Sequence, residues 1–147
     1  LEWISAGPKS KPFAGTFNGQ MHTISGIYLD SDVMNTGLFS VTAEESTIKN
    51  LKLKNSYFKS EASFTGSIVG QGRGKIDTVY SDATVKGPYM TGGIVGIAYT
   101  DDAFIEKSWF DGTVVCTSAG SNDRGGGRGL WPRKSRRADG RDPSAGG

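Results

Sequence analysis

One short phrase recurs three times, and it constrains the fold more than any other feature. The phrase consists of a small residue, two apolar residues and a second small residue. Its copies are Gly37-Leu38-Phe39-Ser40, Ser67-Ile68-Val69-Gly70 and Gly93-Ile94-Val95-Gly96. Each copy is followed about ten residues later by a strand-like segment that opens on isoleucine. A period of roughly 20–50 residues built from short strands indicates stacked units that bury their apolar faces against one another.

The isoleucine-led segments align into rows. The leading residues Ile24, Ile48, Ile76 and Ile105 are 24, 28 and 29 residues apart. Because side chains alternate between the two faces of a strand, the residues three and five places further on share one face and point inward. Those two rows are Ile27, Leu51, Val79 and Ser108, then Leu29, Leu53, Ser81 and Phe110. We therefore predict an all-β fold over residues 1–120, a short parallel β-solenoid of about four coils.

The repeated phrase itself predicts a further inward row, made of Leu38, Ile68 and Ile94. Gly70 and Gly96 follow at equivalent places, where we expect positive φ or a close backbone approach. A stack of few coils leaves two open ends with unpaired strand edges. We expect the segment 13–21 to cover one end. The other end, near Val114 and Val115, is expected to pair with another molecule.

Length and composition narrow the class of protein. The 147 residues allow one ordinary domain. The sequence contains no apolar run of roughly 18 residues, so we expect no membrane-spanning helix. The single cysteine, Cys116, excludes an internal disulfide, and we expect it to be a small buried apolar residue. Since the chain opens on Leu1 without a signal segment, we expect a piece of a longer protein.

The charge is divided unevenly along the chain. Residues 1–120 carry two more acidic than basic side chains, whereas residues 121–147 carry four more basic than acidic ones, with six of the seven arginines. This Gly/Arg-rich tail has too little apolar content to fold alone. It is a basic arm for nucleic acid or acidic polymers, a flexible linker, or a non-native extension. The basic residues change abruptly from lysine to arginine at about residue 120, which favours the non-native extension. With no spaced aromatics or nucleic-acid motif, we expect no nucleic-acid partner.

The segment Phe13-Ala14-Gly15-Thr16-Phe17-Asn18-Gly19-Gln20-Met21-His22-Thr23-Ile24-Ser25-Gly26-Ile27 resembles the opening segment of GLUG-repeat proteins. That segment typically reads F-x-G-x-F-D-G-x-G-H-x-I-x-G-L, and the phrases at 37–40 and 93–96 resemble the G-L-x-G signature of the repeat. Asn18, Met21 and Ser67 depart from the pattern. The resemblance covers roughly residues 3–117. It implies a right-handed parallel β-helix from a bacterial secreted or surface protein, often adhesin-like, without a general catalytic set.

One outward-facing row carries the candidate ligand site. Between the two inward rows lie Tyr28, Lys52, Tyr80 and Trp109, and two places further on lie Asp30, Lys54, Asp82 and Asp111. Sugar rings stack on flat aromatic surfaces, and nearby carboxylates accept hydrogen bonds from hydroxyl groups. The rows predict a glycan-binding surface on a structural or adhesive module. The alternative is that these aromatics pack against a flanking loop and that the acids are simply solvated.

An enzymatic alternative uses Asp82 and Asp111, which this alignment places on adjacent coils. Carboxylates about 5 Å apart would match a retaining glycosidase, and the alternative function is a carbohydrate-active hydrolase or lyase. His22, the only histidine, is expected to make a structural hydrogen bond. The turn acids lack a calcium-loop pattern, so we expect neither metal nor cofactor. The expected location is extracellular or the bacterial cell surface, with glycans, proteins or further copies of the chain as partners.

Overall fold

The structure, a computed structural model, describes residues 2–101 and 103–118, so the predicted tail at 121–147 and the domain boundary near 120 lie outside the described residues. All regular elements in the described part are β-strands, and all strand pairings are parallel. The strands are β1 (Thr16–Ser25), β2 (Tyr28–Ser31), β3 (Phe39–Val41), β4 (Thr47–Lys54), β5 (Tyr57–Ser60), β6 (Val69–Gly72), β7 (Lys75–Ser81), β8 (Thr84–Gly87), β9 (Val95–Ala98), β10 (Phe104–Glu106), β11 (Trp109–Phe110) and β12 (Thr113–Cys116).

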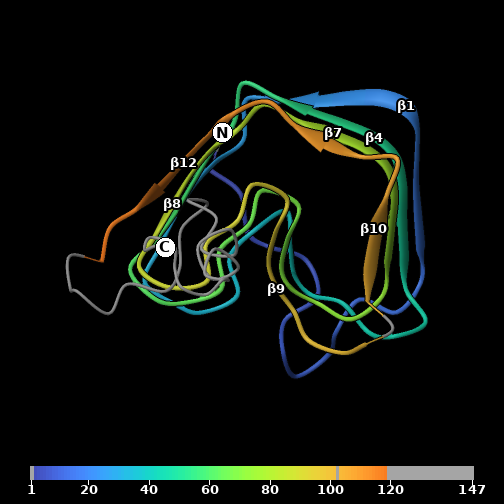
Figure 1. The fold of residues 1–147 in the computed structure, drawn as a ribbon, viewed down its shortest axis with the longest axis horizontal. Coiled ribbons are helices and arrows are strands. Elements are labelled where there is room, and N and C mark those ends of the chain that lie inside the picture. The colour runs from blue at the N-terminus through green and yellow to red at the C-terminus, as the bar shows by residue number, and fades with distance from the viewer. Residues whose placement is uncertain (1, 102, 119–147) are drawn as a thin grey trace, which may run out of the picture.

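The chain winds through three sheets in turn (Figure 1). The first sheet stacks β1, β4 and β7, with β10 and β11 beyond β7; the second stacks β2, β5, β8 and β12; the third stacks β3, β6 and β9. This arrangement confirms the predicted all-β parallel solenoid. The described residues form three complete turns and only the β10–β12 part of a fourth, rather than four complete coils.

The inward rows hold the turns together. Ile48, Ile76 and Ile105 are in register, as are Leu51 with Val79 and Leu53 with Ser81. Leu38, Ile68 and Ile94 are all buried and lie one residue before the in-register Phe39, Val69 and Val95. The isoleucine-led rows confirm the predicted alignment of the second, third and fourth turns, and the Leu38 row confirms that of the first three turns in the third sheet. Since burying an aliphatic side chain contributes about 1.5–3 kcal/mol, the rows are the main stabilising element of the stack.

Glycines permit the close approach of adjacent turns. A Cβ atom on Gly70 would lie 2.4 Å from the carbonyl carbon of Asn35, and one on Gly96 would lie 2.6 Å from that of Phe64. Asn35 and Phe64 have positive φ and turn the chain from the second sheet towards the third. The expected close approach is confirmed at both glycines, and neither has a positive φ.

The first turn does not have the predicted register. Ile24 pairs with Leu53, and it is Phe17 that pairs with Ile48. Between Asn18 and His22 the strand β1 contains two more residues than β4 has between Lys49 and Leu51. The alignment of Ile24 with Ile48 was therefore wrong. Counting from one isoleucine to the next assumes that all turns have a similar length, and the two extra residues of β1 break that assumption.

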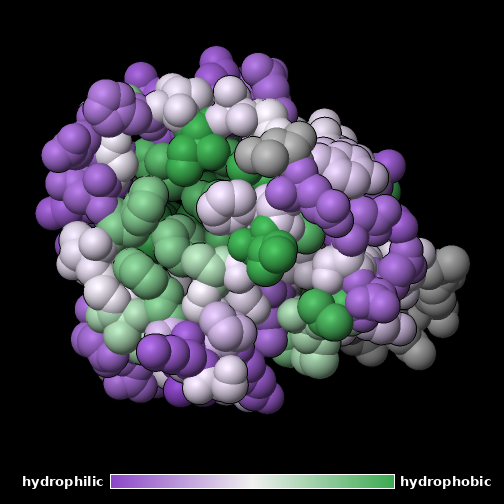
Figure 2. All heavy atoms as spheres, turned by 180° about the vertical axis from the view of Figure 1, so that it is seen from behind, coloured by the Kyte–Doolittle hydropathy of each residue, from purple (hydrophilic) through white to green (hydrophobic). Residues whose placement is uncertain are grey.

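The predicted end cover was also placed too late in the chain. Residues before 14 cover the first turn: Glu2 bridges to Tyr28, Ala6 to Phe39 and Phe13 to Thr42. Residues 16–21 belong to β1 itself, which is an edge of its sheet. Phe13, Phe17 and Ile24 pack on the core while staying partly exposed. In the view from behind, apolar side chains gather in the middle of the face within a hydrophilic rim (Figure 2).

At the other end of the stack, β10, β11, β12 and β9 are edges among the described residues. The exposed fraction rises along one row, from 1% at Ile48 and 4% at Ile76 to 45% at Ile105. Val115 and Phe104 are exposed for a different reason, because they are in register with the outward-facing Lys86 and Lys75. The described fourth turn therefore presents an apolar row and unpaired backbone groups, as expected for an open end.

Candidate functional site

A repeated bend in the first sheet shapes the candidate site. Asn50, Thr78 and Lys107 have φ of 54°, 57° and 49°, and they occupy equivalent places on successive turns. Positive φ is uncommon for residues other than glycine, and for β-branched Thr78 it is an outlier. The bend divides the fourth-turn strand into β10 and β11 at Lys107. The outward side chains after the bend therefore share one outer surface of the solenoid.

In the first turn the same bend contains the two extra residues of β1. Gln20 and Met21 both have positive φ. Asn18 closes this bulge, because its Oδ1 accepts hydrogen bonds from the backbone N–H of Gln20 at 2.9 Å and from Nδ2 of Asn50 at 3.0 Å. A Cβ atom on Gly19 would lie only 2.6 Å from the carbonyl oxygen of Asn50. The bulge leaves Met21 about half exposed beside β4.

Beyond the bend, one outward row combines a cation with two aromatic rings. Lys52 is in register with Tyr80, and Tyr80 with Trp109. The two rings meet edge to face, with centroids 5.4 Å apart and an interplanar angle of 75°. Nζ of Lys54 lies 5.8 Å from the centroid of the Tyr80 ring. Trp109 is 62% exposed, so most of its indole is accessible to a ligand.

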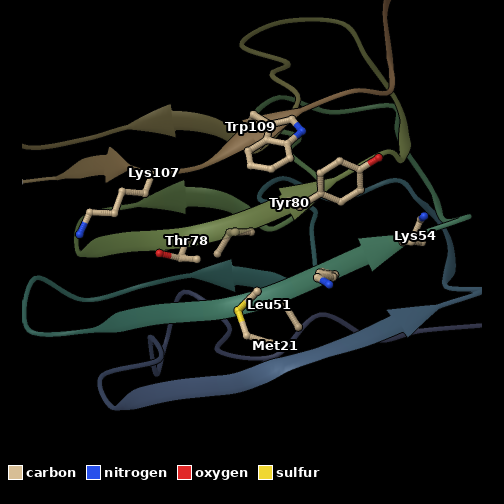
Figure 3. Close-up of a pocket in the computed structure, with 9 residues that line it drawn as sticks. Met21, Leu51, Lys54, Thr78, Tyr80, Lys107 and Trp109 are labelled. Atoms are coloured by element: carbon tan, nitrogen blue, oxygen red, sulfur yellow. The ribbon is translucent and has the colours of Figure 1, made fainter.

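These side chains border a surface hollow of about 310 Å³ (Figure 3). Lys54 lies at one end and Lys107 at the other, with Tyr80 and Trp109 on adjacent strands between them. The residues that line the hollow are Met21, Leu51, Lys52, Lys54, Thr78, Val79, Tyr80, Lys107 and Trp109. The predicted row Lys52, Tyr80 and Trp109 therefore borders one concave surface, together with three residues the sequence did not point to: Met21, Thr78 and Lys107.

The hollow is basic. Within the described part of the chain, no acidic side chain lines it and no ion pair involves Lys52, Lys54 or Lys107. Across the bend, the hydrogen bond from the Thr78 hydroxyl lowers the pKa of Asp77, and the nearby ammonium groups of Lys107 and Lys75 lower it further. Asp77 is thus ionised at neutral pH and offsets part of the Lys107 charge.

Tyr28 does not belong to this row. It pairs with Tyr57 in the second sheet, where the two rings stack at 5.3 Å and 8°, and Nζ of Lys86 lies 5.5 Å from the Tyr57 centroid. Asp30 likewise pairs with Lys59 rather than Lys54. The grouping of Tyr28 with Lys52 was wrong because it depended on the incorrect alignment of Ile24.

Asp82 and Asp111 occupy equivalent positions on adjacent turns, since the N–H of Asp111 donates to the carbonyl oxygen of Ser81 at 2.9 Å. Neither residue lines the hollow. Oδ1 of Asp82 accepts a hydrogen bond from the backbone N–H of Asn55 at 2.8 Å, and Asn55 has a φ of 50°. Asp82 therefore stabilises a tight corner of the preceding turn.

The remaining candidate residues lie elsewhere. His22 is exposed in β1, in register with Leu51. Cys116 is partly exposed rather than buried, and its Sγ lies 3.2 Å from the carbonyl oxygen of Pro88. Within residues 2–101 and 103–118, no three His, Cys, Asp or Glu side chains cluster so as to hold a metal ion. The same residues contain no helix of the length and apolar character that crossing a bilayer requires.

The chain is similar to segments of two much longer proteins. It is 34% identical over 97 residues to "Halomucin" from Haloquadratum walsbyi, covering 65% of this chain and 1% of that protein. It is 31% identical over 80 residues to a "Putative Gly-rich membrane protein" from Evansella cellulosilytica, covering 52% of this chain and 9% of that protein. No family model matches the chain, and no solved structure matches it. The resemblance to GLUG-repeat proteins therefore remains an expectation.

Proposed function

We propose that this β-solenoid module binds glycans through Tyr80, Trp109 and Lys52 on the outer face of its first sheet. The observation that carries the proposal is the hollow that these three residues border. Parallel pairing holds β4, β7 and β11 in register, so the backbone positions of Lys52, Tyr80 and Trp109 are set before any ligand arrives. A preformed platform reduces the ordering cost of binding.

The geometry of the rings favours this face over that of Tyr28. In the edge-to-face contact of Tyr80 with Trp109, the edge of one ring lies against one face of the other, and Trp109 stays 62% exposed to a sugar. Tyr28 and Tyr57 instead cover each other face to face. A glycan placed at the hollow would stack on the indole and donate or accept hydrogen bonds at its rim.

We expect Trp109→Ala to weaken retention on an immobilised polysaccharide panel about tenfold, a loss of about 1.4 kcal/mol. The physical reason is that the indole supplies most of the exposed aromatic area of the hollow. Affinity electrophoresis against the panel measures the effect. Tyr28→Ala is the comparison, and we expect it to retain binding; an equal loss in both variants would contradict a site confined to the hollow.

The alternative, a hydrolase or lyase using Asp82 and Asp111, is tested in the same samples. Their equivalent positions on adjacent turns are the observation that favours it. Release of reducing ends that disappears in Asp111→Asn would establish the enzyme. Retention without release supports the binding module.

The module is proposed to belong to a secreted or cell-surface protein, with adhesion as its role. Its similarity to part of a protein named as a membrane protein supports this location. The matched segments cover 1% and 9% of the two relatives' lengths, which supports a module within a much longer protein.

We also propose that the open end self-associates, with the fourth-turn edge pairing with a second copy of the chain. The observation is the exposure of Ile105, which is 45% against 4% for Ile76 in the same row. Sedimentation velocity over rising protein concentration is expected to show association that Ile105→Lys reduces, since a charge would be desolvated at the contact. Val33→Lys is the control, because Val33 is exposed in the first turn, away from the fourth-turn edge. A chain that stays monomeric throughout contradicts the proposal.

A further inference from the structure

We infer that the glycan bound at the hollow is acidic, a polysaccharide whose carboxylate or sulfate groups meet the ammonium groups of Lys52 and Lys54. The inference deepens the proposed function and rests on it. It concerns the charge of the ligand, whereas the proposed function concerns only sugar stacking.

The first argument is the composition of the lining. Among the described residues, three lysines and no acidic side chain border one hollow of about 310 Å³. Lys52 and Lys54 are successive outward residues of β4 and lie on the same side of the strand. Both residues are partly buried. Long side chains placed in this way keep their charged ends in water at the rim of the hollow.

The second argument is the pairing of the neighbouring charges. On the far side of the bend, the acids are already engaged: Nζ of Lys75 lies 2.9 Å from Glu106 and 3.8 Å from Asp77. On the near side, Asp82 accepts the backbone hydrogen bond of Asn55. Lys52 and Lys54 are members of no ion pair among the described residues, so a ligand's anion meets cations that need not first break an ion pair.

The third argument places charge beside the stacking surface. Nζ of Lys54 lies 5.8 Å from the centroid of Tyr80, and Lys52 is in register with Tyr80. A sugar stacked on the aromatic pair would therefore hold a ring substituent near an ammonium group. A uronate presents a carboxylate at such a position, whereas a neutral hexose presents only a hydroxymethyl group. The same row favours a sugar over a nucleic acid as the ligand. A channel that binds single-stranded nucleic acid stacks successive bases on a series of aromatic side chains, whereas the described residues of this hollow include one aromatic pair.

The test compares polygalacturonate with its carboxyl-reduced form, which has the same backbone without the charge. Biolayer interferometry on the 147-residue chain should show about tenfold tighter binding of polygalacturonate at low salt, with the difference shrinking as salt screens the charges. The double variant Lys52→Gln/Lys54→Gln should lose about tenfold towards polygalacturonate and remain unchanged towards the reduced polymer. Lys49→Gln, on the same strand but outside the hollow, is the matched control and should change neither.

The outcomes separate the two levels of the proposal. Equal binding of both polymers overturns the acidic ligand and leaves glycan binding standing. Binding of neither polymer, nor of a sulfated galactan, overturns both. Single-stranded DNA that binds as tightly as polygalacturonate at the same salt also overturns the inference, because the hollow would then be a general polyanion site. Tighter binding of the charged polymer that depends on Lys52 and Lys54 but not on Lys49 supports it.

Discussion

Gly70→Ala is expected to destabilise the protein by about 3 kcal/mol. The added Cβ atom would lie 2.4 Å from the carbonyl carbon of Asn35 and 2.6 Å from both the Cα atom of Asn35 and the backbone nitrogen of Thr36. These are backbone atoms of the adjacent turn, so no side-chain rotation can relieve the contact. Since small domains are stable by only about 5–15 kcal/mol, urea denaturation should show a clear fall in the midpoint.

Gly15→Ala is the control for this variant. Its nearest neighbours would be ring atoms of Phe13 at 3.8 and 3.9 Å, and its φ is not positive. We expect a change within about 1 kcal/mol, in the stabilising direction, because alanine restricts the unfolded chain. Equal losses at Gly70 and Gly15 would show that close stacking of the turns is not what requires glycine at position 70.

Phe58→Ala is expected to cost about 3–5 kcal/mol, the range for truncating a buried aromatic residue. Phe58 is completely buried and is in register with Leu29 on one side and Val85 on the other. Its removal would leave a cavity that neighbours fixed by strand pairing cannot fill. Thermal and urea unfolding of the whole chain measure the loss.

Tyr57→Ala, at the preceding residue of the same strand, is the matched control. Tyr57 faces outward and is only partly buried, and its ring stacks on that of Tyr28. We expect a loss of about 1 kcal/mol, the usual contribution of an aromatic pair. A larger loss for Tyr57 than for Phe58 would mean that the inner and outer faces of β5 have been exchanged.

The candidate site was predictable in part. Lys52, Tyr80 and Trp109 come from turns of almost equal length, so counting from Ile48, Ile76 and Ile105 aligns them correctly. Met21 and Lys107 could not be assigned in this way. They border the hollow because the backbone bends through positive φ at Lys107 and bulges at Met21, and non-glycine residues carry no clear sequence signal for that conformation.

Tyr28 illustrates the limit of the pattern. The segment 24–29 matches the isoleucine-led segments in its apolar spacing, yet its structural partner is 53–58, five residues further along than predicted. Apolar alternation of period two recurs in each sheet of a turn, so it determines which face is buried and leaves open which sheet the strand joins.

The sequence by itself determined the parallel solenoid, its inward rows and the glycines between turns. The reason is that apolar residues with this period are buried when equivalent residues of successive turns stack on one another. The tertiary structure alone decided the register of the first turn, the end covered by residues 2–13, and which outward side chains border one hollow. Those features depend on backbone bends and on strand pairing between turns of unequal length, and both are settled only when neighbouring backbones meet.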